Sequence, residues 1–214
     1  MASFNKDNFI DCGDYYLCKY PQGTKEWLAS RPEVTASVIA YYVGLDKKPD
    51  FQQSKEEQEE NFRKGHIGEE IIKEWFVKKY GKKIKDLSLV VPKWDTNIGA
   101  SVDGISDLEE VGEDGKEEEK FIIECKTTKR LKSLLKGSKE ERKGKEPKEY
   151  LRKAHYYQML MGMKLLNVKL CYYLVFAYED KKFFKVGVKF NQEDWQHLYD
   201  LYKKKSNNQG LCKD

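Results

Sequence analysis

The sequence lacks the long apolar segments, internal repeats and charge excess that would assign it to a protein class at once. Its longest apolar runs, such as residues 170–177, are far too short to span a bilayer. Its 40 basic and 36 acidic residues leave a net charge of only +4, so composition alone does not indicate a nucleic-acid partner. With 39% apolar residues in 214, the chain is long enough for one soluble domain with a substantial core.

Cysteine pairs at metal-binding spacing are also missing. The five cysteines are odd in number, and none belongs to a CxxC pair (Cys12, Cys18, Cys125, Cys171 and Cys212). The N-terminal residues show no signal-peptide pattern. We therefore expect an intracellular protein whose reduced thiols act as small apolar side chains, without a structural zinc or iron–sulfur site.

Hydrophobic periodicity and chain breakers predict an α/β protein. Helical patterns cover residues 24–31, 35–44, 54–80, 150–166 and 193–205, and strand-like patterns cover residues 87–91, 98–105, 121–127, 168–178 and 183–190. The apolar residues of the longest helix fall mostly on one side (Phe62, Ile67, Ile71, Ile72, Trp75, Phe76 and Tyr80). The order of these elements favours a mixed sheet flanked by helices, in a single domain over residues 1–214.

The remaining segments are predicted to be loops or tails. Residues 107–119 are acidic and indicate a solvated hairpin loop. Residues 129–148 are rich in Lys, Gly and Ser and indicate a mobile basic loop. Residues 1–13 and 206–214 are expected to be loosely ordered tails.

One strand-like segment combines apolar residues with two opposite charges. In FIIECK at 121–126, alternation would place Glu124 and Lys126 on one face with Ile122, and Ile123 and Cys125 on the other. A carboxylate and an ammonium group in a central strand are costly unless they pair or bind something. Taken alone, this tripeptide also fits an edge strand whose charges are solvated.

A second acid falls in the preceding strand-like segment, IGASVDGI at 98–105. Taken alone, Asp103 and the glycine after it fit a turn. A hairpin between this segment and residues 121–127 would instead place Asp103 beside Glu124. Adjacent carboxylates repel each other unless a proton or a cation intervenes, and hard divalent cations such as Mg²⁺ prefer oxygen ligands.

Two helical residues extend this group of candidates. At helical spacing Glu69 shares a side with Ile72 and Phe76, whereas Glu70 turns toward solvent. Glu69 can therefore aim at the sheet, although both acids also fit a helix surface. Gln158 falls on the apolar side of its helix, where its amide needs partners, so it would either bond a backbone carbonyl or orient the site.

In this order the motifs resemble the lambda-exonuclease-like (YqaJ-type viral recombinase) branch of the PD-(D/E)xK nucleases, over roughly residues 20–180. The motifs that carry the resemblance are QGTKEWLASR at 22–31 with VTAS at 34–37, GHIGE at 65–69, GASVDG at 99–104, ECK at 124–126 and YQ at 157–158. The chain departs from the family at Val102, where Pro is usual, and at Leu160, where a second Gln is frequent. Its acidic insert after Asp107 is also longer than expected. None of these departures removes a catalytic group.

The resemblance implies a restriction-endonuclease-like core and a metal-dependent exonuclease that digests linear double-stranded DNA from 5′ ends, leaving a 3′ single strand. By position, the ligands of two Mg²⁺ ions, which Mn²⁺ can replace, would be Glu69, Asp103, Glu124 and the backbone carbonyl of Cys125. Lys126 would position or deprotonate the attacking water, and Gln158 would orient Lys126 or the water.

The same resemblance implies a pocket for the terminal 5′-phosphate. It would be formed by Arg31, Thr35 and Ser37, with Ser101 and Arg130 as weaker candidates. Arginine offers a planar pair of donors to phosphate oxygens, and hydroxyl groups add further hydrogen bonds. Thr35 or Ser37 would also fit a helix N-cap, which is compatible with phosphate binding because helix N-termini attract anions.

The partners implied by the resemblance are double-stranded DNA, a single-strand annealing protein and further copies of the chain in a ring-shaped homotrimer, with no membrane. A viral chain would act in the host cytoplasm or nucleus. The alternatives are an endonuclease of the same fold and a catalytically silent DNA-binding module. A Mg²⁺-binding protein without a nucleic-acid role agrees less well with Arg31 and with the basic residues 129–148.

Overall fold

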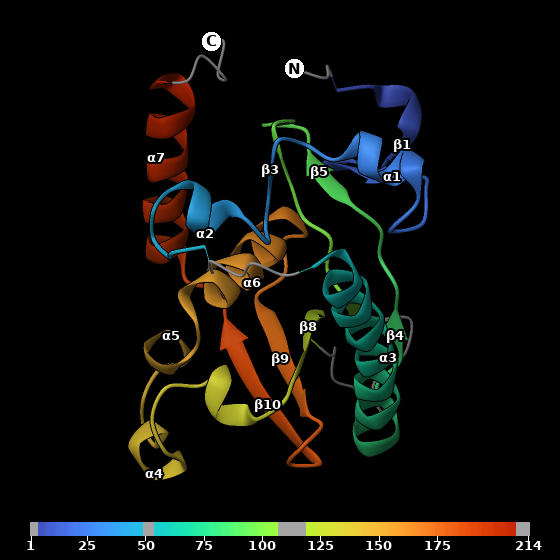
Figure 1. Cartoon of the computed structure of the whole chain (residues 1–214). Coiled ribbons are helices and arrows are strands. Elements are labelled where there is room, and N and C mark those ends of the chain that lie inside the picture. Colours follow the sequence, from blue (N-terminus) through green and yellow to red (C-terminus); the bar gives the residue numbers. More distant parts are fainter. Residues whose placement is uncertain (1–3, 49–53, 107–118, 209–214) are drawn as a thin grey trace.

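A mixed five-stranded sheet forms the centre of the protein (Figure 1). The computed structural model describes residues 4–48, 54–106 and 119–208. The strands lie in the order β10-β9-β8-β7-β4, with the bounds β4 (Ile84–Lys85), β7 (Gly104–Ser106), β8 (Phe121–Thr128), β9 (Leu170–Ala177) and β10 (Lys182–Lys189). Strands β8 and β9 run parallel, whereas the other neighbours are antiparallel.

Helix α3 (Lys55–Tyr80) covers one face of this sheet. Ser54 begins the helix through a capping box with Glu57, and Gly81 ends it in the left-handed conformation, at φ 66°. Ile72 and Phe76 are fully buried in a cluster with side chains of β8 and β9. The sequence predicted this helix within one residue of its bounds.

The predicted apolar side of α3 is only partly buried. Phe62, Ile67 and Ile71 are exposed. Gly68 lies against Thr127, close to the end of β8, and later helical residues pack against earlier residues of the strand. The first turns of α3 therefore extend beyond β8, which explains why Phe62 and Ile67 have no sheet to cover them.

The opposite face of the sheet carries the larger core. It is covered by α6 (Lys153–Leu165), against which α2 (Ile39–Tyr42) and α7 (Gln192–Asn208) pack. The buried cluster includes Ile122 of β8, Met159 of α6 and Tyr173 of β9. At Gly162 the helix comes so close to the sheet that an added Cβ would lie 3.1 Å from Ile122 of β8, and 2.9 Å from Val102.

Two smaller sheets and a short helix complete the fold beside the central sheet (Figure 1). The first contains β1 (Phe9–Asp11), β2 (Tyr15–Cys18) and β5 (Val90–Pro92), and the second pairs β3 (Val34–Thr35) in parallel with β6 (Ile98–Gly99). Helix α1 (Lys25–Ser30) is capped by the Thr24 hydroxyl. This arrangement brings residues 31–37 next to the segment that precedes β7.

The structure differs from several predicted bounds. Residues 6–11, expected in a loose tail, form the 3-10 turn η1 (Lys6–Asn8) and β1. The predicted helix 35–44 is shorter, because Thr35 belongs to β3 and its backbone pairs with Gly99. The predicted strand 98–105 is divided into β6 and β7. Helix α7 continues to Asn208, into the predicted tail.

The prediction that residues 129–148 form a loop is wrong. Residues 129–148 contain η2 (Leu131–Ser133), α4 (Lys139–Arg142) and the start of α5 (Pro147–Tyr150). Capping boxes begin both α4 and α5, which shows that this segment holds local helix signals despite its Lys, Gly and Ser content. Residues 107–118 of the predicted acidic loop lie outside the described residues.

None of the helices within the described ranges combines the length and the apolar character that crossing a bilayer requires. The predicted fold class, an α/β protein with a restriction-endonuclease-like core and a mixed sheet flanked by helices, is confirmed.

Candidate active site

Strand β8 places a carboxylate and an ammonium group in the middle of the sheet. Glu124 is 2% exposed, and the Lys126 side chain is 25% exposed. The ammonium of Lys126 donates a hydrogen bond to Oε1 of Glu124. Strand β8 pairs with β9 along its whole length and with β7 as far as Ile123. Because Glu124 is buried and paired with Lys126, the alternative of an edge strand whose charges are solvated is wrong.

Asp103 lies opposite this pair, as the sequence predicted. The β7–β8 register aligns Gly104 with Ile123, which places the preceding Asp103 beside Glu124. Oδ2 of Asp103 accepts a hydrogen bond of 2.6 Å from the backbone N–H of Cys125. The carboxylate is therefore attached to the strand that carries the other two charged groups.

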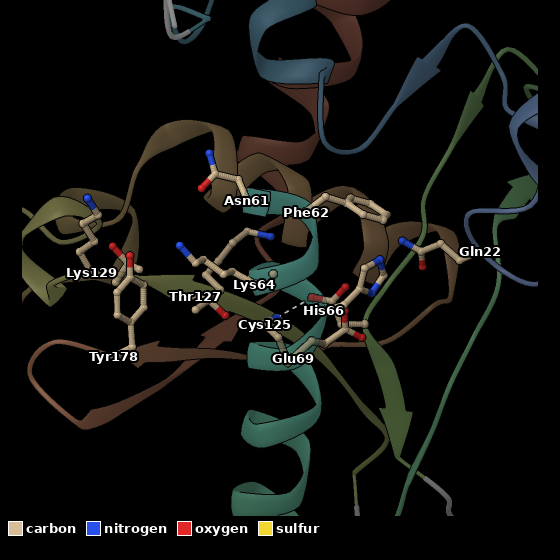
Figure 2. A pocket seen from close by; sticks show the side chains of 14 residues that line it. Gln22, Asn61, Phe62, Lys64, His66, Glu69, Cys125, Thr127, Lys129 and Tyr178 are labelled. Carbon is tan, nitrogen blue, oxygen red and sulfur yellow. Dashed lines mark hydrogen bonds between the residues drawn. The ribbon is translucent and has the colours of Figure 1, made fainter. Parts of the chain in front are cut away.

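Glu69 approaches the same place from helix α3. It lines a pocket of about 570 Å³ together with Asp103, Cys125 and Lys126. Figure 2 shows Glu69 on the helix, next to Cys125 of β8. Glu69 is half-buried and Glu70 is exposed, in agreement with the predicted orientation of the helix.

Burial and mutual repulsion make the carboxyl groups of Glu124 and Asp103 hard to ionise. Burial raises the pKa of Glu124 to about 8, and nearby Asp103 adds to the effect while Lys126 opposes it. Burial also raises the pKa of Asp103, with Lys126 opposing and Glu69 contributing. The two acids therefore favour an additional positive charge between them.

Lys126 stays protonated in this environment. Burial alone would lower the pKa of its ammonium group, but the carboxylates of Glu124 and Asp103 outweigh burial and raise that pKa above its usual value. The sequence left two roles open for Lys126, which were to position or to deprotonate the attacking water. A protonated ammonium group favours the first role.

The acids fit a hard divalent cation by their chemistry but do not yet surround one. In the part of the chain that the structure describes, no group of three or more His, Cys, Asp or Glu side chains is arranged to hold a metal ion. Each carboxylate has an internal partner: Glu124 has Lys126, Glu69 has Lys73, and Asp103 has the Cys125 N–H. Carboxylate oxygens are nevertheless the ligands that Mg²⁺ prefers, and the sequence predicts the Cys125 carbonyl as a further oxygen ligand.

A second pocket, of about 460 Å³, adjoins the first. Both pockets are lined by Asp103 and Lys126, and the second also contains the residues predicted for phosphate binding and for orientation of the site: Arg31, Thr35, Ser37, Ser101 and Gln158. Half-buried Gln158 thus lies at the site rather than elsewhere on its helix.

Three polar groups of the second pocket are connected to one another. Arg31 Nη2 donates to the Thr35 hydroxyl at 3.1 Å, and the Thr35 and Ser37 hydroxyls are 3.2 Å apart. The guanidinium group of this exposed arginine lies over the Trp27 ring, 5.1 Å from its centre, which favours this orientation. The result is a cation beside two hydroxyls, a donor set suited to a phosphate group.

Arg130, the weaker phosphate candidate, is not among the residues that line this pocket. Its Nε donates to Oε2 of Glu179 at 2.8 Å, and its side chain is exposed. Strand β8 ends at Thr128, and Arg130 follows it and pairs with Glu179 of the β9–β10 turn. Its contribution to phosphate binding stays a prediction.

Two polar contacts at the site were not predicted. Lys73 pairs with Glu69, and the helical i, i+4 spacing of these residues could have indicated this. His155 of α6 and Tyr173 of β9 join through Nδ1 and the hydroxyl at 2.7 Å. Burial lowers the pKa of His155 and raises that of Tyr173, and the charge of Lys126 acts to lower both. No local pattern indicates this second pair, because it depends on how helix and sheet pack.

The sequence of residues 26–164 matches the model of the YqaJ-like viral recombinase domain. The chain belongs to this family. The resemblance stated from the motifs is thereby confirmed. No curated protein matches the chain at a significant level.

Solved structures support the same fold for this YqaJ-like domain. An alkaline exonuclease from Laribacter hongkongensis has a TM-score of 0.56 at 15% identity, covering 86% of this chain and 92% of that one. The same exonuclease in complex with dAMP has a TM-score of 0.58 at 16% identity, with the same coverage. At such low identity these likenesses establish the fold alone.

Proposed function

We propose that this YqaJ-like domain is a Mg²⁺-dependent exonuclease that digests one strand of linear double-stranded DNA from its 5′ end and leaves a 3′ single strand. The observation that carries the proposal is the junction of two pockets at Asp103 and Lys126. One pocket presents carboxylates and the other presents Arg31, Thr35 and Ser37. A terminal phosphate in the second pocket would place a nearby phosphodiester at the first.

Family membership and the fold shared with alkaline exonucleases support the same conclusion. In hydrolysis a water oxygen bonds to phosphorus, and the bond from phosphorus to the 3′ oxygen of the terminal nucleotide breaks. The released nucleotide keeps its 5′-phosphate, and the shortened strand begins with a new one. The product end therefore carries the group that the Arg31 pocket would bind next.

Asp103, Glu124, the Cys125 carbonyl and Glu69 would hold two Mg²⁺ ions, or Mn²⁺ in their place. When bound, such ions lower the pKa of a water molecule and stabilise the charge that develops on phosphate. Protonated Lys126 would orient the attacking water and contribute positive charge, and Gln158 would restrict the position of either group.

The decisive experiment compares linear duplex with closed circular duplex, each with Mg²⁺ and with EDTA. Digestion of the linear DNA alone, only with Mg²⁺, is expected. Cleavage of the circle would instead identify an endonuclease of the same fold. DNA binding without hydrolysis under any metal condition would identify a silent binding module.

The resemblance extends this proposal to the assembly. The domain would cover residues 1–214, form a ring-shaped homotrimer around the duplex and deliver the 3′ strand to an annealing protein. Light scattering with size-exclusion chromatography tests the first step, because a monomer at working concentration contradicts the ring.

A further inference from the structure

Lys73 lies on α3 one turn after Glu69 and contacts two carboxylates at once. Its ammonium nitrogen is 2.6 Å from Oε1 of Glu69 and 2.7 Å from Oδ1 of Asp86. The side chains of Lys73 and Glu69 are 21% and 27% exposed, whereas that of Asp86 is 85% exposed. Asp86 follows β4 and does not line the pocket. Lys73 therefore has one partner inside the site and one outside it.

This contact determines what Glu69 is able to bind. Glu69 lines the pocket, yet one of its oxygens already accepts a short hydrogen bond from a cation. Gly68 lies against Thr127 so closely that the helix cannot move nearer to β8 at this point. A change of partner by Glu69 thus requires rotation of its side chain and loss of the bond to Lys73.

Asp86 makes such a change less costly. If Glu69 turns away, Lys73 retains an acidic partner at 2.7 Å instead of losing both of its ion pairs. A half-buried lysine without any counter-ion would be far less favourable, because burial penalises the charged form. The two acidic partners of Lys73 therefore have different roles: Glu69 can change to another partner, and Asp86 keeps Lys73 paired when it does.

We propose that Lys73 is a positioning residue that holds the Glu69 carboxylate in the metal-free protein and yields it to a divalent cation, while Asp86 remains as its counter-ion. This inference rests on the proposed function, since it requires a cation site at Glu69. It also explains why the acids do not yet form a metal-binding group: the cation must displace an ammonium group to complete its ligands.

A simpler interpretation is that Lys73 and Glu69 form an ordinary i, i+4 surface pair. Such a pair contributes little to stability and has no bearing on cation affinity. The two interpretations differ in what happens when Lys73 is removed. If the pair is an ordinary one, removal of Lys73 should cause a small loss of stability and leave cation binding unchanged. If the cation displaces Lys73 from Glu69, the same removal should tighten cation binding.

The test measures Mn²⁺ binding by calorimetry on the full chain without DNA. Lys73→Met should tighten Mn²⁺ binding about two- to tenfold, because the cation no longer competes with the ammonium. Asp86→Asn should weaken binding by a similar factor, because Lys73 then has only Glu69. Lys73→Arg, which keeps a cation beside both acids, should stay close to the wild type.

Lys64→Met is the matched control. Lys64 lines the same pocket on the same helix, but its ammonium pairs with Glu60 rather than Glu69. If Lys64→Met and Lys73→Met tighten Mn²⁺ binding equally, the cause is the loss of any positive charge near the pocket, and the proposal is overturned. If Lys73→Met does not fold, Lys73→Gln provides the same removal of charge.

Thermal unfolding gives an independent measurement. In EDTA, Lys73→Met should unfold at a lower temperature than the wild type, and saturating Mn²⁺ should remove that difference. Wild-type protein that binds no Mn²⁺ would overturn both the metal site and this inference. Wild-type protein that binds Mn²⁺ as well as Lys73→Met does, or better, would overturn the inference alone.

Discussion

The backbone N–H of Cys125 donates a hydrogen bond of 2.6 Å to Oδ2 of Asp103. This bond joins the segment before β7 to the strand that carries Glu124 and Lys126. Asp103 therefore has a structural partner as well as its proposed role as a metal ligand. The two roles are separable, because one needs only an acceptor oxygen and the other needs a negative charge.

Asp103→Asn and Asp103→Ala should separate these roles. Asparagine keeps an acceptor for Cys125, so its variant should fold with wild-type stability or better while nuclease activity falls about a hundredfold or more. Alanine leaves the Cys125 N–H without its partner and should lower the free energy of unfolding by about 1–3 kcal/mol as well. Urea unfolding and digestion of linear duplex measure the two effects, and full activity of either variant would exclude Asp103 from catalysis.

Lys126→Met should lower the rate of digestion about a hundredfold or more without changing the shape of the pH–rate profile. The carboxylates of Glu124 and Asp103 keep the Lys126 pKa above its usual value, so the ammonium is charged throughout the neutral range. Rates measured from pH 6 to 10 with saturating Mg²⁺ test this. A rise with pH that disappears in Lys126→Met would contradict it, because that rise would show Lys126 acting as a free base.

The metal-free protein should lose stability as pH rises from about 4.5 to about 8. Glu124 has a pKa of about 8 in the folded protein, raised chiefly by burial, against an ordinary value of 4.5. Between these values the folded state binds more protons than the unfolded state, so unfolding becomes easier as pH rises and the effect levels off above pH 8. The raised pKa of Asp103 acts in the same direction, and Lys126 titrates above this window.

Chemical unfolding in EDTA at several pH values between 4.5 and 9 measures this slope. Glu124→Gln should flatten it, because the amide has no proton to lose at these pH values. Saturating Mn²⁺ should also reduce it, since a cation stabilises the ionised carboxylates. A slope that is equally steep in the wild type and in Glu124→Gln would assign it to other groups.

Arg31→Met should remove the preference for 5′-phosphorylated ends. Charge-assisted hydrogen bonds contribute about 1.5–3 kcal/mol, so KM for a phosphorylated duplex should rise about tenfold or more, while a 5′-hydroxyl duplex is digested at an unchanged rate. Arg130→Met is the matched control, because Arg130 pairs with Glu179 outside the pocket. Equal rates of the wild type on both kinds of end would argue against the Arg31 pocket.

Much of this fold could be predicted because its main elements are long and strongly patterned. Helix α3 has a capping box at one end and a glycine at the other, and β8, β9 and β10 are continuous segments of eight residues each. The short strands β3, β4 and β6 have two residues each, too few for a periodic signal. Their pairing depends on tertiary contacts that no local pattern records.

In the site, too, some features have a local sequence pattern and others depend on tertiary contacts. The proximity of Asp103, Glu124 and Lys126 could be predicted because charged residues inside apolar segments stand out against their surroundings. The contact between Lys73 and Asp86 joins a helix to a loop, and Asp86 gives no sign of it in the sequence. The pairing of Arg130 with Glu179 of the β9–β10 turn likewise depends on tertiary structure, and no local pattern records it.

Gly68→Ala should reduce both stability and nuclease activity. An added Cβ would lie 2.0 Å from Thr127 Oγ1 and 2.8 Å from its Cγ2, so α3 would have to move away from β8. Overpacking of this kind costs about 1–3 kcal/mol, which exceeds the gain of about 1 kcal/mol from replacing a helical glycine by alanine. Because Glu69 is the next residue, it would move away from Asp103.

Gly65→Ala on the same helix is the matched control, since an added Cβ there meets nothing within 4 Å. It should raise the free energy of unfolding by about 0.5–1 kcal/mol through helix propensity alone. Thr127→Ala removes the two closest contacts, so the Gly68→Ala/Thr127→Ala protein should recover part of the lost stability and activity. Additive losses in the double variant would mean that Gly68 acts through something other than its contact with Thr127. The close approach of α3 to β8 would then not be what positions Glu69.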